Sequence, residues 1–304
     1  INWNTFNNSE NKRLLDLPTY PFIKKRFKAD PFFNTQSQSL TQETRGHNKQ
    51  ANIKDWFYFP SWERKTLKSI QIKKEQKYKW LIFNDHLNRF NRLIEKLKRE
   101  GHDVIEVKTG GIFSEKSDGL YTICPSQKMH YEMLFSELEQ KDLLPNKIIH
   151  AWSFNPVNEV ILDQERIERS MDEGYYSLLY IAQAIGKINY EGALQLNIFT
   201  DRMFEVTGTE LNLKPEQATI LGFSKICNLE FQNIKCRTID MDTDSQQMFE
   251  EAGLMESFVD STDIVVAYRG RHRWAQTIIQ SPFEEEDVEI DRLREGGVYL
   301  ITGG

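Results

Sequence analysis

Apolar residues form short clusters along residues 53–304. Clusters of consecutive apolar residues alternate with clusters in which the apolar residues lie three or four positions apart. Short, largely apolar runs predict buried strands, and they lie at residues 80–83, 104–107, 120–124, 147–152, 194–199 and 234–239. Apolar residues three or four positions apart predict helices between them, at residues 87–97, 129–138, 175–185 and 215–221. Repeated strand-helix units predict an α/β fold: a Rossmann-like, doubly wound parallel sheet with helices on both faces.

An aromatic-rich segment precedes the first of these units, at residues 55–62. Aromatic residues favour a strand, but Pro60 cannot donate a hydrogen bond to a neighbouring strand. This segment is therefore predicted to be an edge strand. Residues 28–52 carry few apolar residues and no periodicity, which is typical of a linker.

The last residues, 297–304, run from Val298–Ile301, which is apolar and rich in β-formers, into Thr302, Gly303 and Gly304. This pattern predicts a buried parallel strand that leads into a glycine-rich turn for phosphate. A dinucleotide site needs further glycines and a helix N-terminus after the strand. We therefore expect the cofactor-binding role of Thr302, Gly303 and Gly304 only in a longer, intact protein.

The turn after the first predicted strand, residues 83–87, contains no glycine. Side chains would occupy the space in which a pyrophosphate must approach the backbone, and the Asp85 carboxylate would repel it. A Rossmann-like sheet with such a turn is predicted to be non-catalytic and to bind no cofactor by itself.

Charge divides the chain unevenly. The net charge is -6, but residues 1–77 carry +8 and the remainder carries -14. This step predicts a leader followed by an acidic domain.

The absence of an apolar run near 18 residues excludes a membrane-spanning helix. Three cysteines suit a reducing cytoplasm, and no His or Cys stands at metal-ligand spacing from another.

The leader contains the run Leu17-Pro18-Thr19-Tyr20-Pro21-Phe22 and a basic, aromatic tail. The two prolines force an extended path, which predicts a strap over another surface. The hexapeptide resembles the end of the linker that wraps back over the ketosynthase of modular polyketide synthases. One short basic run on an acidic chain is weak support for nucleic-acid binding, so neither nucleic acid nor membrane is an expected partner.

Three later segments resemble, in order and spacing, the ketoreductase of modular type I polyketide synthases. They are Pro215–Lys225, Val265–Trp274 and Thr302–Gly304. In that family a truncated, pseudo-Rossmann structural half precedes a catalytic half. The resemblance implies a leader at residues 1–52, the structural subdomain at residues 53–295, and the first strand of the catalytic subdomain at residues 296–304. It implies no catalytic residue in this chain.

The function implied by the resemblance is to brace an NADPH-dependent β-ketoacyl reductase within a synthase module. The implied partners are the catalytic ketoreductase subdomain, an upstream ketosynthase and an acyl carrier protein. Two alternatives stay open: a divergent NAD(P)-dependent reductase, and a docking platform for a trans-acting acyltransferase or a carrier protein. Arg269, Arg271 and Arg273 are predicted to share one face of a strand, where they could bind a carrier's phosphate or form salt bridges.

Overall fold

The computed structural model describes residues 52–67, 77–154, 164–242, 246–259, 261–281, 294 and 296–302. All of them belong to the second of the two units into which the chain divides, Ile1–Ala51 and Asn52–Gly304. The predicted strap at residues 17–22 lies outside the described residues. The domain boundaries inferred from the sequence stay predictions.

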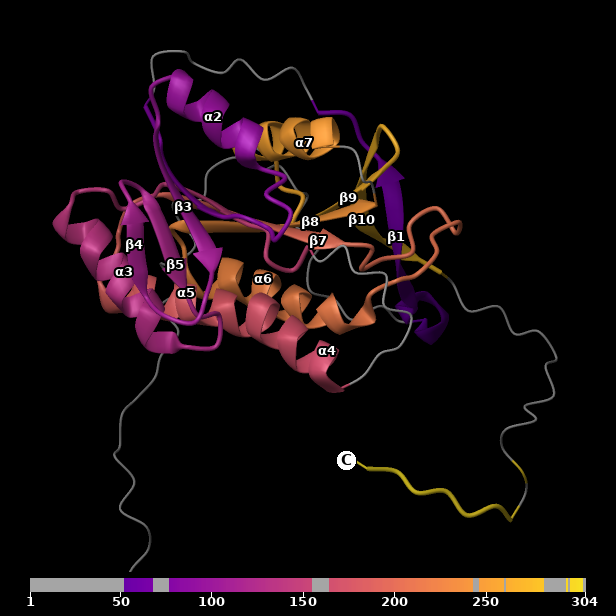
Figure 1. Cartoon of the computed structure of the whole chain (residues 1–304). Helices are drawn as coiled ribbons and strands as arrows, with labels where there is room; N and C mark the ends of the chain where they lie inside the picture. The colour runs from indigo at the N-terminus through magenta and orange to yellow at the C-terminus, as the bar shows by residue number, and fades with distance from the viewer. Residues whose placement is uncertain are drawn as a thin grey trace, which may run out of the picture. The chain divides into compact units, whose positions relative to one another are not determined.

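The described residues form one ten-stranded sheet with the order β1-β10-β9-β8-β7-β6-β2-β3-β5-β4 (Figure 1). Neighbours from β9 to β5 run parallel, whereas β10, β1 and β4 run antiparallel to their neighbours at the two edges. The strands are β1 Tyr58–Arg64, β2 Lys79–Phe83, β3 Asp103–Thr109, β4 Ser114–Ser117, β5 Leu120–Ile123, β6 Lys147–His150, β7 Leu194–Asp201, β8 Ile234–Asp242, β9 Val265–Arg269 and β10 His272–Gln280. The predicted Rossmann-like fold is confirmed, and the strand with Pro60 lies at the edge as expected.

Helices cover both faces of the sheet (Figure 1). One face carries α2 (Asn91–Arg99) and α7 (Gln246–Phe258), which come close at Gly253, where a Cβ would lie only 3.0 Å from the Phe90 ring. The other face carries α3 (Lys128–Gln140), α4 (Gln164–Ser170), α5 (Ser177–Lys187) and α6 (Thr219–Glu230). Two short 3-10 helices, η1 (Ile53–Trp56) and η3 (Pro215–Ala218), and a π-helical segment, η2 (Met171–Tyr176), complete the described elements.

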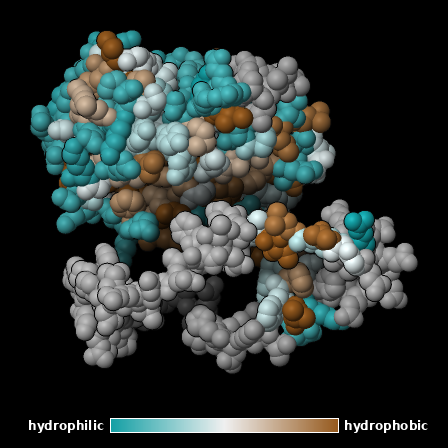
Figure 2. Space-filling model, turned by 90° about the horizontal axis from the view of Figure 1, so that it is seen from below, coloured by the Kyte–Doolittle hydropathy of each residue, from teal (hydrophilic) through white to brown (hydrophobic). Residues whose placement is uncertain are grey.

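Each face of the sheet has its own hydrophobic core, and the central strands contribute to both. On β2, Leu81 and Phe83 point into the core beneath α3, α5 and α6. Trp80 and Ile82 point into the core beneath α2 and α7. This double burial explains why the strand is a continuous apolar run rather than an alternating one. The surface over α4, α5 and α6 is mixed, with hydrophobic patches among hydrophilic residues (Figure 2).

Two helix predictions need correction. The helix expected to begin near Leu87 begins at Asn91, because residues 84–90 form a turn held by polar side chains. On α3, Met129 and Met133 were expected to face the core, but both are exposed. The buried side of α3 instead consists of Tyr131, Leu134, Phe135 and Leu138.

The apolar segment near the C-terminus does not join the sheet in this structure. Val298 is 96% exposed and Leu300 is 91% exposed, so these residues are not buried in this structure, and their place as the first strand of a catalytic subdomain stays a prediction. A parallel strand becomes buried only when neighbouring strands and helices cover it. None of the described strands pairs with residues 298–301.

The orientation of α3 can be tested with two neighbouring residues. Leu134→Ala removes a fully buried side chain and should lower the free energy of unfolding by about 2–5 kcal/mol. Met133→Ala is the matched control, because its side chain is 40% exposed, and it should change stability by less than about 1 kcal/mol. Urea unfolding followed by tryptophan fluorescence measures both, and equal effects would contradict this orientation.

Candidate functional site

The position at which a doubly wound sheet binds its ligand is the topological switch point, at the carboxyl ends of the strands. In this sheet the order reverses between β2 and β6. The crevice to examine therefore lies between the turn after Phe83 and the turn after His150. In the structure side chains of the protein itself fill this region.

The Asp85 carboxylate occupies the position of an anion in the turn after β2. Its oxygens accept hydrogen bonds from the backbone N–H groups of Arg89 (2.6 Å) and Leu87 (3.3 Å). The Arg89 guanidinium donates to the same carboxylate at 3.1 Å. The Asp85 side chain is only 1% exposed. Backbone N–H groups that a phosphate would need are thus already used by a carboxylate of the chain.

Asn84 fills the rest of this turn. Its amide nitrogen donates to Asn91 Oδ1 (2.8 Å) and to Glu106 Oε1 (2.7 Å), which links the turn to α2 and to β3. Its amide oxygen accepts from the backbone N–H of Phe90 at 3.4 Å. The backbone N–H of Phe90, directly before α2, is therefore satisfied by Asn84, and that of Asn91 by the carbonyl of Asn88 (3.1 Å).

The β6 side of the crevice is closed by the long helix that contains η2. Gly174 lies so close to the strand end that a Cβ there would be 3.2 Å from Ser153 Oγ. Ser177 Oγ lies 2.7 Å from Nε2 of the fully buried His150. Burial lowers the pKa of His150 to about 3, so this ring is neutral and belongs to the core.

One ion pair spans the mouth of the crevice. His86 Nε2, from the turn after β2, lies 3.1 Å from Glu173 Oε1 on η2. The hydrogen bond to Glu173 raises the pKa of His86 above its usual value, although burial opposes this effect. The pair ties the two sides of the switch point together.

The carboxyl ends of β7 and β8 carry a second set of internal ion pairs. Asp201 on β7 pairs with Lys214 and with Arg202. Asp240 on β8 accepts hydrogen bonds from Thr200 Oγ1 and from the backbone N–H of Met203, and it pairs with Arg269 at 2.6 Å. Desolvation raises the pKa of Asp240 to about 6, although Arg269 opposes this shift.

Glu210 provides a further internal anion, in the loop after β7. Its carboxylate accepts from the backbone N–H groups of Val206 (3.1 Å) and Thr207 (2.9 Å), and from Arg269 Nε (2.8 Å). Burial would raise the pKa of Glu210, but these donors outweigh burial and lower it to about 2. The carboxylate is therefore ionised at neutral pH and fixed.

The sequence prediction for the three arginines was wrong in one respect. Gly270 and Arg271 form the turn between β9 and β10, so Arg269, Arg271 and Arg273 do not alternate on one strand. Arg269 is buried against Glu210 and Asp240, and Arg273 is buried against Glu256 and Asp263. Salt bridges inside the domain, not a ligand, occupy these two side chains.

Of the three predicted cofactor residues, the structure describes only Thr302. Thr302 is exposed, and Gly303 and Gly304 lie outside the described residues. Their role in an intact protein stays a prediction. The described residues contain no group of three or more His, Cys, Asp or Glu that could hold a metal ion. No helix among them combines the length and hydrophobicity that crossing a bilayer requires.

Fold and site together define a Rossmann-like domain whose nucleotide crevice is filled by its own side chains. The family model described as "Beta-ketoacyl synthase-like, N-terminal" matches residues 68–260, which is more than half of the chain. The chain belongs to this beta-ketoacyl synthase-like, N-terminal family.

Relatives place the chain among modular synthases. Polyketide synthase PksM of Bacillus subtilis (strain 168) is 21% identical over 313 residues, which include all of this chain but only 7% of that synthase. A structure with adenylation, ketoreductase and pseudo Asub domains, from a keto acid-selecting NRPS module, matches with a TM-score of 0.67 and 22% identity. It covers 74% of this chain and 18% of that one.

An N-terminal ketoreductase from the macrolactin assembly line also matches, with a TM-score of 0.62 and 17% identity. The match covers 74% of this chain and 44% of that ketoreductase. The fold is thus that of polyketide synthase ketoreductases, and the resemblance predicted from the sequence is confirmed at the level of family and fold.

The internal anion of the β2 turn can be removed by Asp85→Ala. This change deprives the buried Arg89 guanidinium of its carboxylate and two backbone N–H groups of their acceptor. The free energy of unfolding should fall by about 3–5 kcal/mol. Asp85→Asn keeps an acceptor oxygen at the same place and should cost less. Urea unfolding compares the two, and an alanine variant as stable as the asparagine variant would contradict the role assigned to Asp85.

Glu210 should make stability depend on pH in the acid range. Because its folded-state pKa is depressed to about 2, its contribution is present above about pH 4.5 and is lost as the pH falls through 2. The contribution is on the order of 3 kcal/mol. Glu210→Gln should flatten the fall of stability below about pH 4.5, whereas Glu205→Gln, an exposed carboxylate in the same loop, should not. Urea unfolding at several pH values measures both, and parallel profiles for the two variants would refute the assignment.

Proposed function

We propose that this chain is the non-catalytic structural half of a polyketide synthase ketoreductase and braces an NADPH-dependent catalytic half. The observation that carries the proposal is the Asp85 carboxylate, which accepts the backbone hydrogen bonds that a dinucleotide phosphate would need. The chain contributes no catalytic residue. NADPH binds only to the intact reductase, whose catalytic half begins with residues 296–304 of this chain.

The surface that meets the catalytic half is, in this proposal, the ribbon formed by β1 and β10. β9 pairs only with His272–Ala275 of β10, so Gln276–Gln280 pair with β1 alone. A two-stranded ribbon has marginal stability in water, and a partner on its apolar side chains would stabilise it. The ribbon and the residues just before it expose large hydrophobic side chains: Trp56, Phe57, Tyr58, Phe59, Ile278 and Ile279.

Chain connectivity supports this location. The ribbon ends at Gln280, and the exposed apolar segment Val298–Ile301 follows it in the sequence. A catalytic half that starts at this segment is connected through residues 281–297 to the ribbon, which lies at the edge of the sheet opposite β4 (Figure 1). The upstream ketosynthase and an acyl carrier protein are the other partners we propose, on the basis of the polyketide synthase relative. The three free cysteines support a reducing, cytoplasmic location.

Two measurements test the proposal together. Calorimetric titration of the 304-residue chain with NADPH should detect no binding tighter than about 1 mM. In the longer synthase, Phe59→Ser with Ile279→Ser removes a cross-strand apolar pair of the ribbon and should weaken NADPH binding and reductase activity at least about tenfold. Met129→Ser, an exposed substitution on α3, is the control and should leave both unchanged.

The outcomes separate the proposal from its rival. Micromolar NADPH affinity of the 304-residue chain, lost on substitution of His86, would identify a divergent reductase instead. Full activity of the longer synthase with the ribbon variant would refute the bracing surface.

A further inference from the structure

A second group of polar side chains lies at the amino ends of the parallel strands, whereas the switch point lies at their carboxyl ends. Lys147 begins β6 and lines a cavity of about 410 Å³ at the amino ends of the parallel strands. Tyr78 and Phe258 provide aromatic walls, and Gln232 and Lys235 lie at its rim. The cavity is independent of the filled crevice described above.

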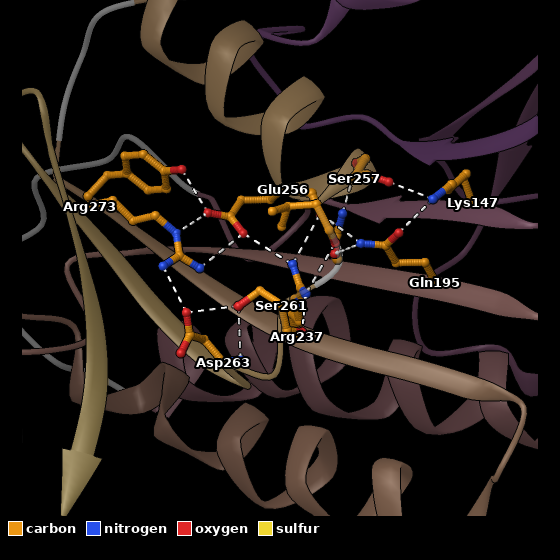
Figure 3. A network of polar contacts seen from close by, with 11 residues as sticks. Lys147, Gln195, Arg237, Glu256, Ser257, Ser261, Asp263 and Arg273 are labelled. Carbon is orange, nitrogen blue, oxygen red and sulfur yellow. Dashed lines mark hydrogen bonds and ion pairs between the residues drawn. The ribbon is translucent and has the colours of Figure 1, made fainter. Parts of the chain in front are cut away.

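The contacts of Lys147 are unusual for a lysine of this chain. Its Nζ donates to Gln195 Oε1 (2.6 Å) and to the backbone carbonyl of Ser257 (2.5 Å), as Figure 3 shows. Neither acceptor is a carboxylate. By contrast, three other lysines of the described part pair with acids: Lys79 with Asp142, Lys141 with Glu115, and Lys187 with Glu132.

The carboxylate nearest to these contacts of Lys147 already forms ion pairs with other cations. Glu256, on α7, pairs with Arg237 (3.3 Å) and Arg273 (2.6 Å) and accepts from the Tyr268 hydroxyl (Figure 3). Lys147 therefore faces the cations Arg237 and Lys235 from β8 without an acidic counterpart among its contacts. Tyr78, with His102 packed against its ring, is the titratable side chain on the β2 side.

This environment favours the neutral amine. Burial is the largest cause, and together with the charges of Arg237 and Lys235 it lowers the pKa of Lys147 to about 8. The rings of Tyr78 and Phe258, 5.2 and 5.4 Å from Nζ, favour the ammonium only modestly. At pH 7 about a tenth of the Lys147 side chains are then free amines, against about 0.04% for an ordinary lysine.

We propose that Lys147 is an acyl-acceptor lysine, whose Nζ attacks activated short-chain acyl groups that enter the cavity at the start of β6. A C–N bond forms between Nζ and the acyl carbonyl carbon. The bond from that carbon to sulfur or to phosphate oxygen breaks, and the leaving group departs with the electron pair as a thiolate or a phosphate. The proton released by Nζ passes to water, and the product is a neutral amide.

The site fits this chemistry on three grounds. The aromatic walls accommodate an apolar acyl group, the rim cation Lys235 favours an anionic leaving group, and the amine needs no catalytic base because it is partly deprotonated. Acylation would remove the charge and replace the short bonds to Gln195 and Ser257. Since Gln195 also donates to the Glu256 carbonyl, the modification would loosen the C-terminal end of α7.

The experiment compares Lys147 with Lys141 in the same 304-residue chain. Lys141 is more exposed, but its ion pair with Glu115 raises its pKa above the usual value. The chain is treated with acetyl phosphate, or with the acetyl thioester of N-acetylcysteamine, at several pH values, and acetylation of each lysine is followed by mass spectrometry. At about pH 7.5 Lys147 should react at least about tenfold faster than Lys141, with a midpoint near pH 8.

Two controls keep the test decisive. Lys147→Arg should abolish the fast phase while it preserves the positive charge, and denaturation in urea should make the two lysines react equally. A fast reaction with either reagent supports the proposal, and the faster reagent identifies the carrier class. A Lys147 rate no greater than that of Lys141 with both reagents overturns it.

Discussion

The arrangement of the whole domain depends on an anion that the chain supplies to itself. In a nucleotide-binding Rossmann sheet, the backbone N–H groups after the first strand remain unsatisfied until a phosphate binds. Here the Asp85 carboxylate satisfies such N–H groups permanently, since a side chain of the same turn is always at high effective concentration. Asn84 adds a hydrogen bond to Glu106 on β3. The helix α2 begins only at Asn91, after the turn that contains both side chains. The fold thus keeps the geometry of a nucleotide domain, while a carboxylate of the chain accepts the hydrogen bonds of the turn after β2.

The same solution recurs along the carboxyl ends of the sheet. Glu210 occupies a cluster of backbone N–H groups, and Asp240 and Asp201 close the ends of β8 and β7 with arginine and lysine partners. Buried ion pairs add little net stability, because the cost of desolvation nearly cancels the attraction. Their directional hydrogen bonds do fix the loops in one arrangement. A domain whose function is to hold a neighbour gains from that rigidity, whereas an enzyme needs an open crevice at this end.

Much of this could be predicted from residues 53–304. The strands were predictable because parallel strands buried on both faces are continuous apolar runs, as in Trp80–Phe83. The glycine-free turn at residues 83–87 indicated that phosphate would be excluded. The face of α3 was not predictable from its apolar residues alone, since Met129 and Met133 fit the same helical spacing as Leu134 and Leu138 but are exposed. Tertiary packing, not periodicity, decides which of two overlapping apolar stripes is buried.

Long-range pairing explains the remaining differences. Gly270 and Arg271 interrupt what looks in the sequence like one continuous strand. The apolar pattern does not show the tight turn after which β10 runs back along β9 and pairs with β1 on its other side. The partners of Arg269 and Arg273 come from two loops, a strand and a helix up to 59 positions away, and they are Glu210, Asp240, Glu256 and Asp263. Lys147 was inconspicuous for a similar reason, since its environment is assembled from β2, β7, β8 and the end of α7.

These pairings also determine which surfaces of the domain are open. The carboxyl ends of the strands, where Rossmann sheets ordinarily act, are closed by internal charges. Two of the surfaces that stay open among the described residues are the apolar ribbon of β1 and β10 at one edge and the Lys147 cavity at the amino ends of the strands. The polar network around Glu256 extends from the cavity, through α7, to Arg273 at the base of β10, and so connects them within one set of hydrogen bonds (Figure 3).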